Sequence, residues 1–275
     1  MRRYAAEAIG TFGVVFMGCG AALVGGARIG DAGVALAFGL ALAVMMIALG
    51  PVSGGHCNPA VTVASAIAGR LPMREVAPYV AAQLGGGVAG AALVVSMANG
   101  RPGGTPLAAQ SIANGFDRLS PGFYGLGAAL IAEIALTALF VLVVLGAGGA
   151  ASSLRRRLSG NDEPPLSAAK GSALGGAPAV APIAALAAGA SYALIHLVGI
   201  PVTRMGANPA RSLGPALLAG GSALEQVAVF LAAPLAGALL AALAHRAIFG
   251  SDPARAASRA PKQPDAREPE ANARG

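Results

Sequence analysis

The tripeptide Asn-Pro-Ala occurs twice in this chain, at Asn58–Ala60 and at Asn208–Ala210. Asn is a favoured N-cap residue and Pro is favoured at the first helical position, so each tripeptide predicts the start of a helix. Each also follows a stretch of irregular, Gly-containing sequence and begins an apolar run of about a dozen residues, whereas a helix that crosses a bilayer needs about 20. Two such short helices at corresponding positions of two apolar halves predict a membrane transport site.

Six other apolar runs are long enough to cross a bilayer. They are Tyr4–Gly25, Gly33–Val52, Val76–Ala98, Phe123–Ala147, Pro178–Pro201 and Gln226–His245, and the short runs Asn58–Gly69 and Asn208–Gly220 follow the second and the fifth. Because three spans in each half is an odd number, the halves enter the membrane in opposite orientations. The predicted fold is therefore an all-α membrane protein with six transmembrane helices and two re-entrant half-helices in an inverted repeat.

The repeat predicts a single domain over residues 1–250, with half-repeats of about 1–120 and 121–250. Residues 148–177 contain three consecutive arginines and two prolines, and are predicted to form an irregular loop. Residues 251–275 are charged and Pro-rich, which is typical of a segment that cannot build a core. They are predicted to be a disordered cytoplasmic tail.

The charged residues indicate a membrane and not a nucleic acid. Only 11% of the chain is charged, against about 25% in a soluble domain, and the net charge of +7 comes from basic residues clustered between the apolar runs. With the N-terminus inside, fourteen of the 19 Lys and Arg residues lie inside and five outside. By the positive-inside rule, both termini are predicted to be cytoplasmic. Cys19 and Cys57 form neither a disulfide framework nor a metal-binding pattern.

The segments before the tripeptides predict the chemistry of the site. Non-helical backbone at membrane depth survives only where it is buried in protein or lines a wet cavity. Its carbonyl oxygens are expected to accept hydrogen bonds from a permeating molecule, while the two Asn amides donate. The positive ends of both half-helices are expected to repel cations and protons. The predicted pore-lining residues are Asn58, Pro59, Ala60, Asn208, Pro209 and Ala210, with the backbone of Gly54, Gly55, His56, Cys57, Gly206 and Ala207.

The segments SGGHCNPAVTVA and GANPARS resemble the signatures of the aquaporin, or major intrinsic protein, family, and the resemblance extends from about Arg3 to Arg246. AAEAIGTF, AGVALAFGL and IPVTRMGANPARS are most similar to bacterial water-selective members of the aquaporin Z type. The resemblance implies one pore per subunit, a homotetramer in the bacterial inner membrane, water as the permeant and no cofactor.

The resemblance also implies a narrow selectivity filter formed by Phe38, His196, Met205 and Arg211. Met205 departs from the small Cys or Thr that water channels usually carry there. Its side chain either narrows the filter or points into the protein, leaving only its carbonyl in the pore. Arg204 departs as well, from a small polar residue, and is expected to add positive charge at the outer mouth.

Glu7 and Glu133 occupy equivalent places in the two halves, each four residues before a Thr. Buried carboxylates in a membrane protein are costly and often functional. The resemblance favours structural support, in which each carboxylate accepts hydrogen bonds from a re-entrant loop. Proton relay is the alternative.

Three functions follow from these residues. The favoured one is a passive water channel. A facilitator of glycerol or another small neutral solute is the alternative, which His196 and Ser212 oppose because such relatives usually carry Gly and Asp there. A proton-coupled transporter is opposed by the two positive helix ends. The sequence shows no Ser/His/Asp set or metal cluster, so an enzyme is not predicted.

Overall fold

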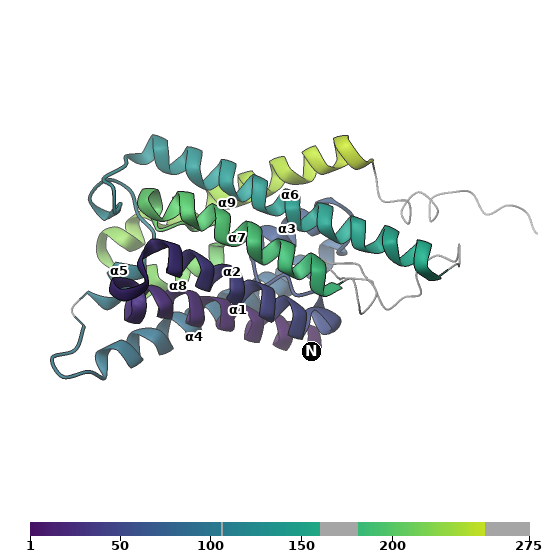
Figure 1. Ribbon diagram of the computed structural model, residues 1–275. Helices are drawn as coiled ribbons and strands as arrows, with labels where there is room; N and C mark the ends of the chain where they lie inside the picture. The colour runs from purple at the N-terminus through teal and green to yellow at the C-terminus, as the bar shows by residue number, and fades with distance from the viewer. Residues whose placement is uncertain (106, 160–180, 251–275) are drawn as a thin grey trace, which may run out of the picture.

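The computed structural model describes residues 1–105, 107–159 and 181–250, and all regular structure in these ranges is helical. Its elements are α1 (Arg2–Gly20), the π-helical turn η1 (Ala21–Gly25), α2 (Gly26–Ser53), α3 (Pro59–Ile67), η2 (Met73–Glu75), α4 (Val76–Asn99), α5 (Ala108–Ile112), η3 (Asp117–Leu119), α6 (Leu126–Ser159), α7 (Ala181–Thr203), α8 (Pro209–Ala219) and α9 (Gly221–Phe249). Figure 1 shows the long helices side by side in one bundle, with the N-terminus and α5 at opposite ends.

The described residues contain five continuous helical stretches that are long and apolar enough to cross a membrane. The first, Arg2–Ser53, holds two spans, because the helix breaks at Gly30, in the second turn of α2, where φ is 62° and ψ is −178°. Glycine has no Cβ and takes up this conformation without strain. The six predicted spans are therefore confirmed as α1, α2, α4, α6, α7 and α9.

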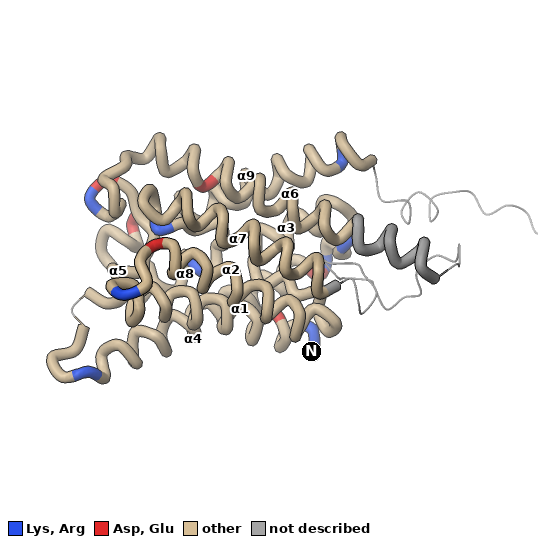
Figure 2. The backbone as a smooth tube through the Cα atoms, viewed as in Figure 1, with Lys and Arg blue, Asp and Glu red and all other residues tan. Residues whose placement is uncertain are grey.

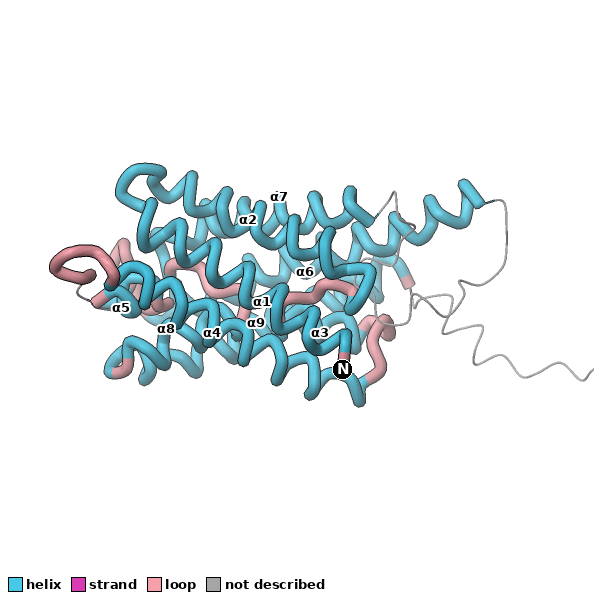
Figure 3. Tube along the Cα trace, turned by 90° about the horizontal axis from the view of Figure 1, so that it is seen from below, coloured by secondary structure: helices cyan, strands magenta, loops and turns pink. Residues whose placement is uncertain are grey.

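The helices pack as an inverted repeat of two similar halves. In the first half α1 packs against α2 and α4, and in the second α6 packs against α7 and α9. The half-helices cross over, so that α3 packs against α9 while α8 packs against α4. The view from below shows loop segments running inside the bundle, with α3 toward the N-terminal end and α8 toward the end that carries α5 (Figure 3).

Glycines allow the helices to approach closely where the halves meet, as is common for helices in membranes. A Cβ added to Gly39 of α2 would lie 2.5 Å from the carbonyl oxygen of Gly189 in α7, and one added to Gly189 would lie 2.5 Å from that of Gly39. The reciprocal contact places the crossing of α2 and α7 on the pseudo-twofold axis.

Replacing Gly86 by Ala is expected to destabilise the contact between α4 and α1. The added methyl group would lie 2.1 Å from the carbonyl oxygen of Ala8, so one helix must shift, at a cost of about 1–3 kcal/mol for overpacking. The adjacent Gly85→Ala variant is the matched control, because its Cβ would meet nothing within 4 Å. Thermal unfolding in detergent should show a lower midpoint for Gly86→Ala alone. Equal midpoints for the two variants would contradict this packing.

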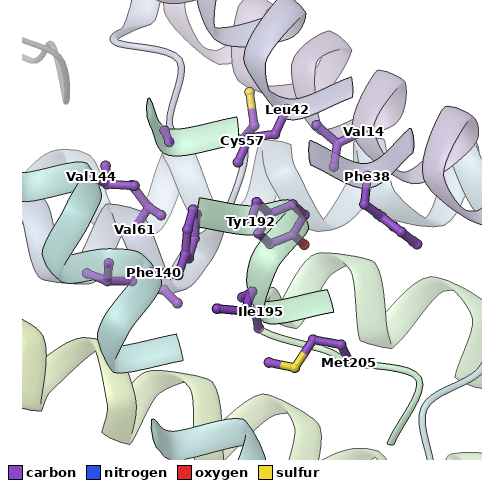
Figure 4. Close-up of a cluster of buried hydrophobic side chains, with 14 of the residues drawn as sticks. Val14, Phe38, Leu42, Cys57, Val61, Phe140, Val144, Tyr192, Ile195 and Met205 are labelled. Atoms are coloured by element: carbon purple, nitrogen blue, oxygen red, sulfur yellow. The ribbon is translucent and has the colours of Figure 1, made fainter. Parts of the chain in front are cut away.

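Charged residues lie mainly at the two ends of the bundle, and its middle is almost free of them (Figure 2). Large apolar side chains cover the outer faces of the helices instead, such as Ile131, 72% exposed, and Leu194, 62% exposed. This distribution fits a protein surrounded by hydrocarbon. The core lies between the long helices and the half-helices, and includes Phe38, Phe140 and Tyr192 (Figure 4).

One expectation about a connecting segment is corrected, and one short helix was not expected. The predicted loop at 148–177 is wrong for residues 148–159, where α6 continues to Ser159. The segment after Gly149 is rich in Ala, Leu and Arg, which favour helix, so nothing stops α6 before Gly160. The short helix α5 was not predicted, because its five residues carry no periodic signal. Residues 160–177 and the predicted tail at 251–275 lie outside the described residues.

Candidate functional site at the meeting of the half-helices

Both tripeptides cap the start of a half-helix. The Asn58 side-chain oxygen accepts a hydrogen bond from the Ala60 amide at 2.8 Å. The Asn208 side-chain oxygen accepts from the amides of Ala210 at 3.0 Å and Arg211 at 3.3 Å. In each case a proline occupies the first helical position, where it has no amide proton to leave unpaired. The side-chain Nδ2 of each Asn is therefore free to point away from its own helix.

The two asparagines join the half-helices at the centre of the molecule. Asn58 Nδ2 donates to the Ala207 carbonyl at 2.9 Å, and Asn208 Nδ2 donates to the Cys57 carbonyl at 2.9 Å. An amide NH₂ group has two protons, so each Asn keeps a second donor beyond this bond. Two donors and two positive helix ends thus meet at one point.

The backbone of the two loops follows the same unusual path. Gly54, Gly55 and Cys57 have left-handed φ values of 97°, 62° and 50°, and residues 204, 205 and 207 at the equivalent places have 61°, 42° and 51°. Non-glycine residues adopt this region only at a cost, and such strain persists where the surroundings hold it. The surroundings here are two buried carboxylates.

Glu7 of α1 holds the first loop. Its Oε1 accepts hydrogen bonds from the His56 amide at 2.9 Å and the Ser53 hydroxyl at 2.6 Å, while Oε2 accepts from the Cys57 amide at 2.7 Å. Gln83 Nε2 donates to the same Oε2 at 2.7 Å. The carboxylate is fully buried, and these donors compensate its loss of hydration.

Glu133 of α6 holds the second loop in the same way. It accepts from the Gly206 amide at 2.7 Å, the Ala207 amide at 2.9 Å and the Thr203 hydroxyl at 2.6 Å. These three donors correspond to His56, Cys57 and Ser53 of the first half. The two carboxylates thus accept hydrogen bonds from the loops and from the helices packed beside the loops, which fits structural support.

Three of the four predicted filter residues meet at the α5 end of the bundle. The rings of Phe38 and His196 stack with their centroids 4.4 Å apart, and the Arg211 Cζ lies 5.3 Å from the centroid of the Phe38 ring. All three side chains are buried. A guanidinium over an aromatic face is attracted by the ring, which fixes the orientation of both groups.

Arg211 is held by groups that the sequence did not indicate. Nη1 donates to the Ile112 carbonyl at 2.9 Å and to Asn114 Oδ1 at 2.9 Å, and Nη2 donates to the Arg204 carbonyl at 3.2 Å. Asn114 in turn donates to the Thr203 carbonyl at 3.0 Å. Nε of Arg211 has no hydrogen-bond partner among the described residues. One donor of a firmly held cation is thus left for another molecule.

His196 leaves one acceptor beside that donor. Its Nδ1 lies 2.8 Å from the Tyr192 carbonyl. A carbonyl oxygen only accepts, so Nδ1 carries the proton, and Nε2 of the neutral ring is an acceptor. Nε2 is buried without a hydrogen-bond partner in the described parts of the chain.

Met205, the fourth filter position, turns its side chain into the protein. A Cβ placed on Gly199 of α7 would lie 2.2 Å from the Met205 Sδ and 2.9 Å from its Cβ and Cγ, so the side chain lies along this glycine. Met205 is fully buried, and Figure 4 shows it beside Ile195 in the apolar core. This geometry favours the interpretation in which only its backbone reaches the filter.

Replacing Gly199 by Ala is expected to lower water permeability several-fold. The new methyl group takes the space of the Met205 side chain, and we expect it to displace that side chain toward the filter. Removing the side chain as well, in Gly199→Ala/Met205→Thr, should restore the parent value. Gly127→Ala, whose Cβ would meet nothing within 4 Å, is the control. The prediction fails if the single variant conducts like the parent in vesicles with equal protein content.

Arg204 faces a loop instead of standing free at the mouth. Its Nη1 donates to the carbonyl oxygens of Ala113 and Leu119. The side chain therefore ties the second re-entrant loop to the segment between α5 and η3. Arg204 thus acts on the site indirectly, because the residues beside that segment hold Arg211.

His56 lies on the other side of the asparagines, in the half of the molecule that holds α3. Its Nδ1 is 3.0 Å from the Thr62 hydroxyl, and its ring centroid is 5.3 Å from that of Tyr79. Nε2 is buried and has no hydrogen-bond partner among the described residues. Buried polar atoms normally have partners, so the unpaired nitrogens of His56, His196 and Arg211 are three candidate contacts for a small polar molecule.

The fold and the site together define a helical membrane protein in which two half-helices meet inside the bundle. The model of the Major intrinsic protein family matches residues 1–245. The chain is 41% identical over 256 residues to an aquaporin Z of Brucella melitensis biotype 1, covering 92% of this chain and all of the relative. It is 40% identical over 250 residues to an aquaporin Z of Bradyrhizobium diazoefficiens, covering 90% and 92%.

The fold is also similar to the X-ray structure of the aquaglyceroporin from Plasmodium falciparum, with a TM-score of 0.70 at 20% sequence identity, over 90% of this chain and 96% of that one. The chain belongs to the Major intrinsic protein family.

Proposed function

We propose that this protein is a passive, water-selective channel driven by osmotic gradients. The observation that carries the proposal is the pair formed by Arg211 Nε and His196 Nε2, one buried donor and one buried acceptor without partners in the described residues. A water molecule both accepts and donates, so it matches this pair. The relatives named aquaporin Z support the same permeant.

Exclusion of protons and ions follows from the charges along the path. Arg211 lies at the filter, and the two helix N-termini lie at the paired asparagines. Both fields oppose a cation. At the centre, the second N–H of each Asn is proposed to donate to a water oxygen, which orients the water with its own protons directed away from both asparagines. The carbonyl groups at Gly54, Gly55, His56 and Gly206 are proposed to accept hydrogen bonds on either side.

The same residues oppose a glycerol facilitator. Phe38 lies against both His196 and Arg211, and because all three side chains are large, a wider filter would need at least one of them to be small. The chain is proposed not to be an enzyme, because the carboxylates of Glu7 and Glu133 already accept four and three hydrogen bonds from the loops and the neighbouring helices. A proton relay through them is disfavoured for the same reason.

We further propose a homotetramer in the bacterial inner membrane with both termini cytoplasmic, as the family resemblance and the distribution of Lys and Arg indicate. Each subunit is proposed to be one channel domain over residues 1–250, built from two halves. In that orientation the α5 end is the outer end.

Stopped-flow light scattering of proteoliposomes tests the permeant. A sucrose gradient should shrink vesicles with the protein much faster than empty ones. A glycerol gradient should give the same fast shrinkage followed by re-swelling at the rate of empty vesicles. Shrinkage at the empty-vesicle rate would refute the channel, and fast re-swelling would favour the glycerol alternative.

A further inference from the structure

Tyr192 carries a buried hydroxyl that neither the filter nor the asparagine pair accounts for. It lies on α7, and its own carbonyl accepts the hydrogen bond from His196 Nδ1. The side chain is 1% exposed, and the hydroxyl oxygen has no hydrogen-bond partner among the residues that the structure describes. Leaving a buried hydroxyl unpaired costs about 1–3 kcal/mol, so a permeating molecule is its natural partner.

The ring of Tyr192 is fixed by three other rings. Its centroid is 4.9 Å from that of Phe140, 4.3 Å from that of His196 and 6.3 Å from that of Phe38. Figure 4 shows the ring beside Phe140, with its hydroxyl on the side away from Phe140. The side chain is therefore packed against two of the filter residues and has little freedom to turn away.

The depth of Tyr192 lies between the filter and the half-helix junction. Tyr192 precedes His196 by four residues, which is about 6 Å along a helix axis. Because α7 ends at Thr203, near α5, Tyr192 lies farther from the α5 end than His196 does and closer to the centre of the bundle. The Asn208 side chain lies close to the Tyr192 hydroxyl, at the limit of hydrogen-bond reach.

We infer that Tyr192 is a further specificity-determining residue, which forms a second constriction below the filter and offers its hydroxyl to passing water. The inference rests on the proposed water channel. A water molecule leaving Arg211 and His196 meets this hydroxyl before it reaches Asn208. A bulkier solute that passes the filter meets the ring.

With a second constriction at Tyr192, widening the filter alone does not admit glycerol. In His196→Gly the filter is opened but Tyr192 still narrows the path, so glycerol flux should stay near the lipid background. In His196→Gly/Tyr192→Val both constrictions are removed, and glycerol flux should rise by about tenfold or more. Equal glycerol flux through the single and the double variant would overturn the second constriction.

The hydroxyl is tested separately with Tyr192→Phe, which keeps the ring and its packing. Water permeability per channel should fall several-fold, because the polar partner between filter and asparagines is lost. Tyr124→Phe is the matched control, since Tyr124 is 45% exposed at the α5 end. Parent-like water permeability in a Tyr192→Phe variant that elutes like the parent would overturn the role of the hydroxyl.

Different outcomes would refute the water channel and the role of Tyr192. If the parent protein does not conduct water under a sucrose gradient, the channel itself is refuted. If the parent conducts and His196→Gly alone admits glycerol, the channel stands and Tyr192 is only a packing residue.

Discussion

Replacing Glu133 by Ala is expected to abolish the folded channel. The change removes the acceptor of two buried loop amides, at Gly206 and Ala207, and of the Thr203 hydroxyl. Each buried amide left unpaired costs about 1–3 kcal/mol, a large part of a typical stability of about 5–15 kcal/mol. The strained backbone at residues 204–207 loses its support as well.

Size-exclusion chromatography and thermal unfolding in detergent measure this effect. Glu133→Ala should aggregate or unfold far below the parent, while Glu225→Ala, which removes an exposed carboxylate at the start of α9, should behave like the parent. A well-folded Glu133→Ala protein with normal water permeability would show that the carboxylate does not hold the loop.

Replacing Arg211 by Val is expected to leave water conduction in place and to raise proton leak. Two unit charges about 5 Å apart repel by about 3 kcal/mol at an effective dielectric constant near 20. That barrier corresponds to about a hundredfold in rate. Because the two helix N-termini still oppose cations at the centre, we expect the measured rise in proton flux to be smaller, about tenfold.

A pH-sensitive dye inside the vesicles measures the leak. Arg118→Val is the matched control, because Arg118 is an exposed arginine in η3, in the segment between α5 and α6 that also contains Asn114, a partner of Arg211. Unchanged proton flux in an Arg211→Val channel that still conducts water would mean that the paired helix ends suffice alone.

Much of the fold was predictable because its signals are local. Asn followed by Pro predicts a helix start from two residues alone, and an apolar run of sufficient length predicts a membrane-spanning helix. The inverted repeat then follows from counting three spans in each half. The end of α6 was not predictable from its apolar run, since the helix continues to Ser159 through a polar segment whose Ala, Leu and Arg residues favour helix.

The parts of the site that the sequence missed depend on contacts between distant segments. Ile112 at the end of α5 and Asn114 just after it hold Arg211, although they lie almost 100 positions earlier in the chain. No pattern in the local sequence SIANG indicates this contact. Gly199 makes room for Met205 only because α7 and the second loop lie side by side. Tyr192 could have been noticed, because it precedes His196 by one helical turn and brings a polar tip into an apolar span.

Simultaneous measurement of water and proton flux in the same proteoliposomes would show whether the protein passes water while it excludes protons. The vesicles would carry a pH-sensitive dye and face a sucrose gradient together with a pH gradient. We expect rapid shrinkage with an internal pH that changes no faster than in empty vesicles. Slow shrinkage, or a pH change that rises with the amount of protein, would contradict a channel that passes water and excludes protons.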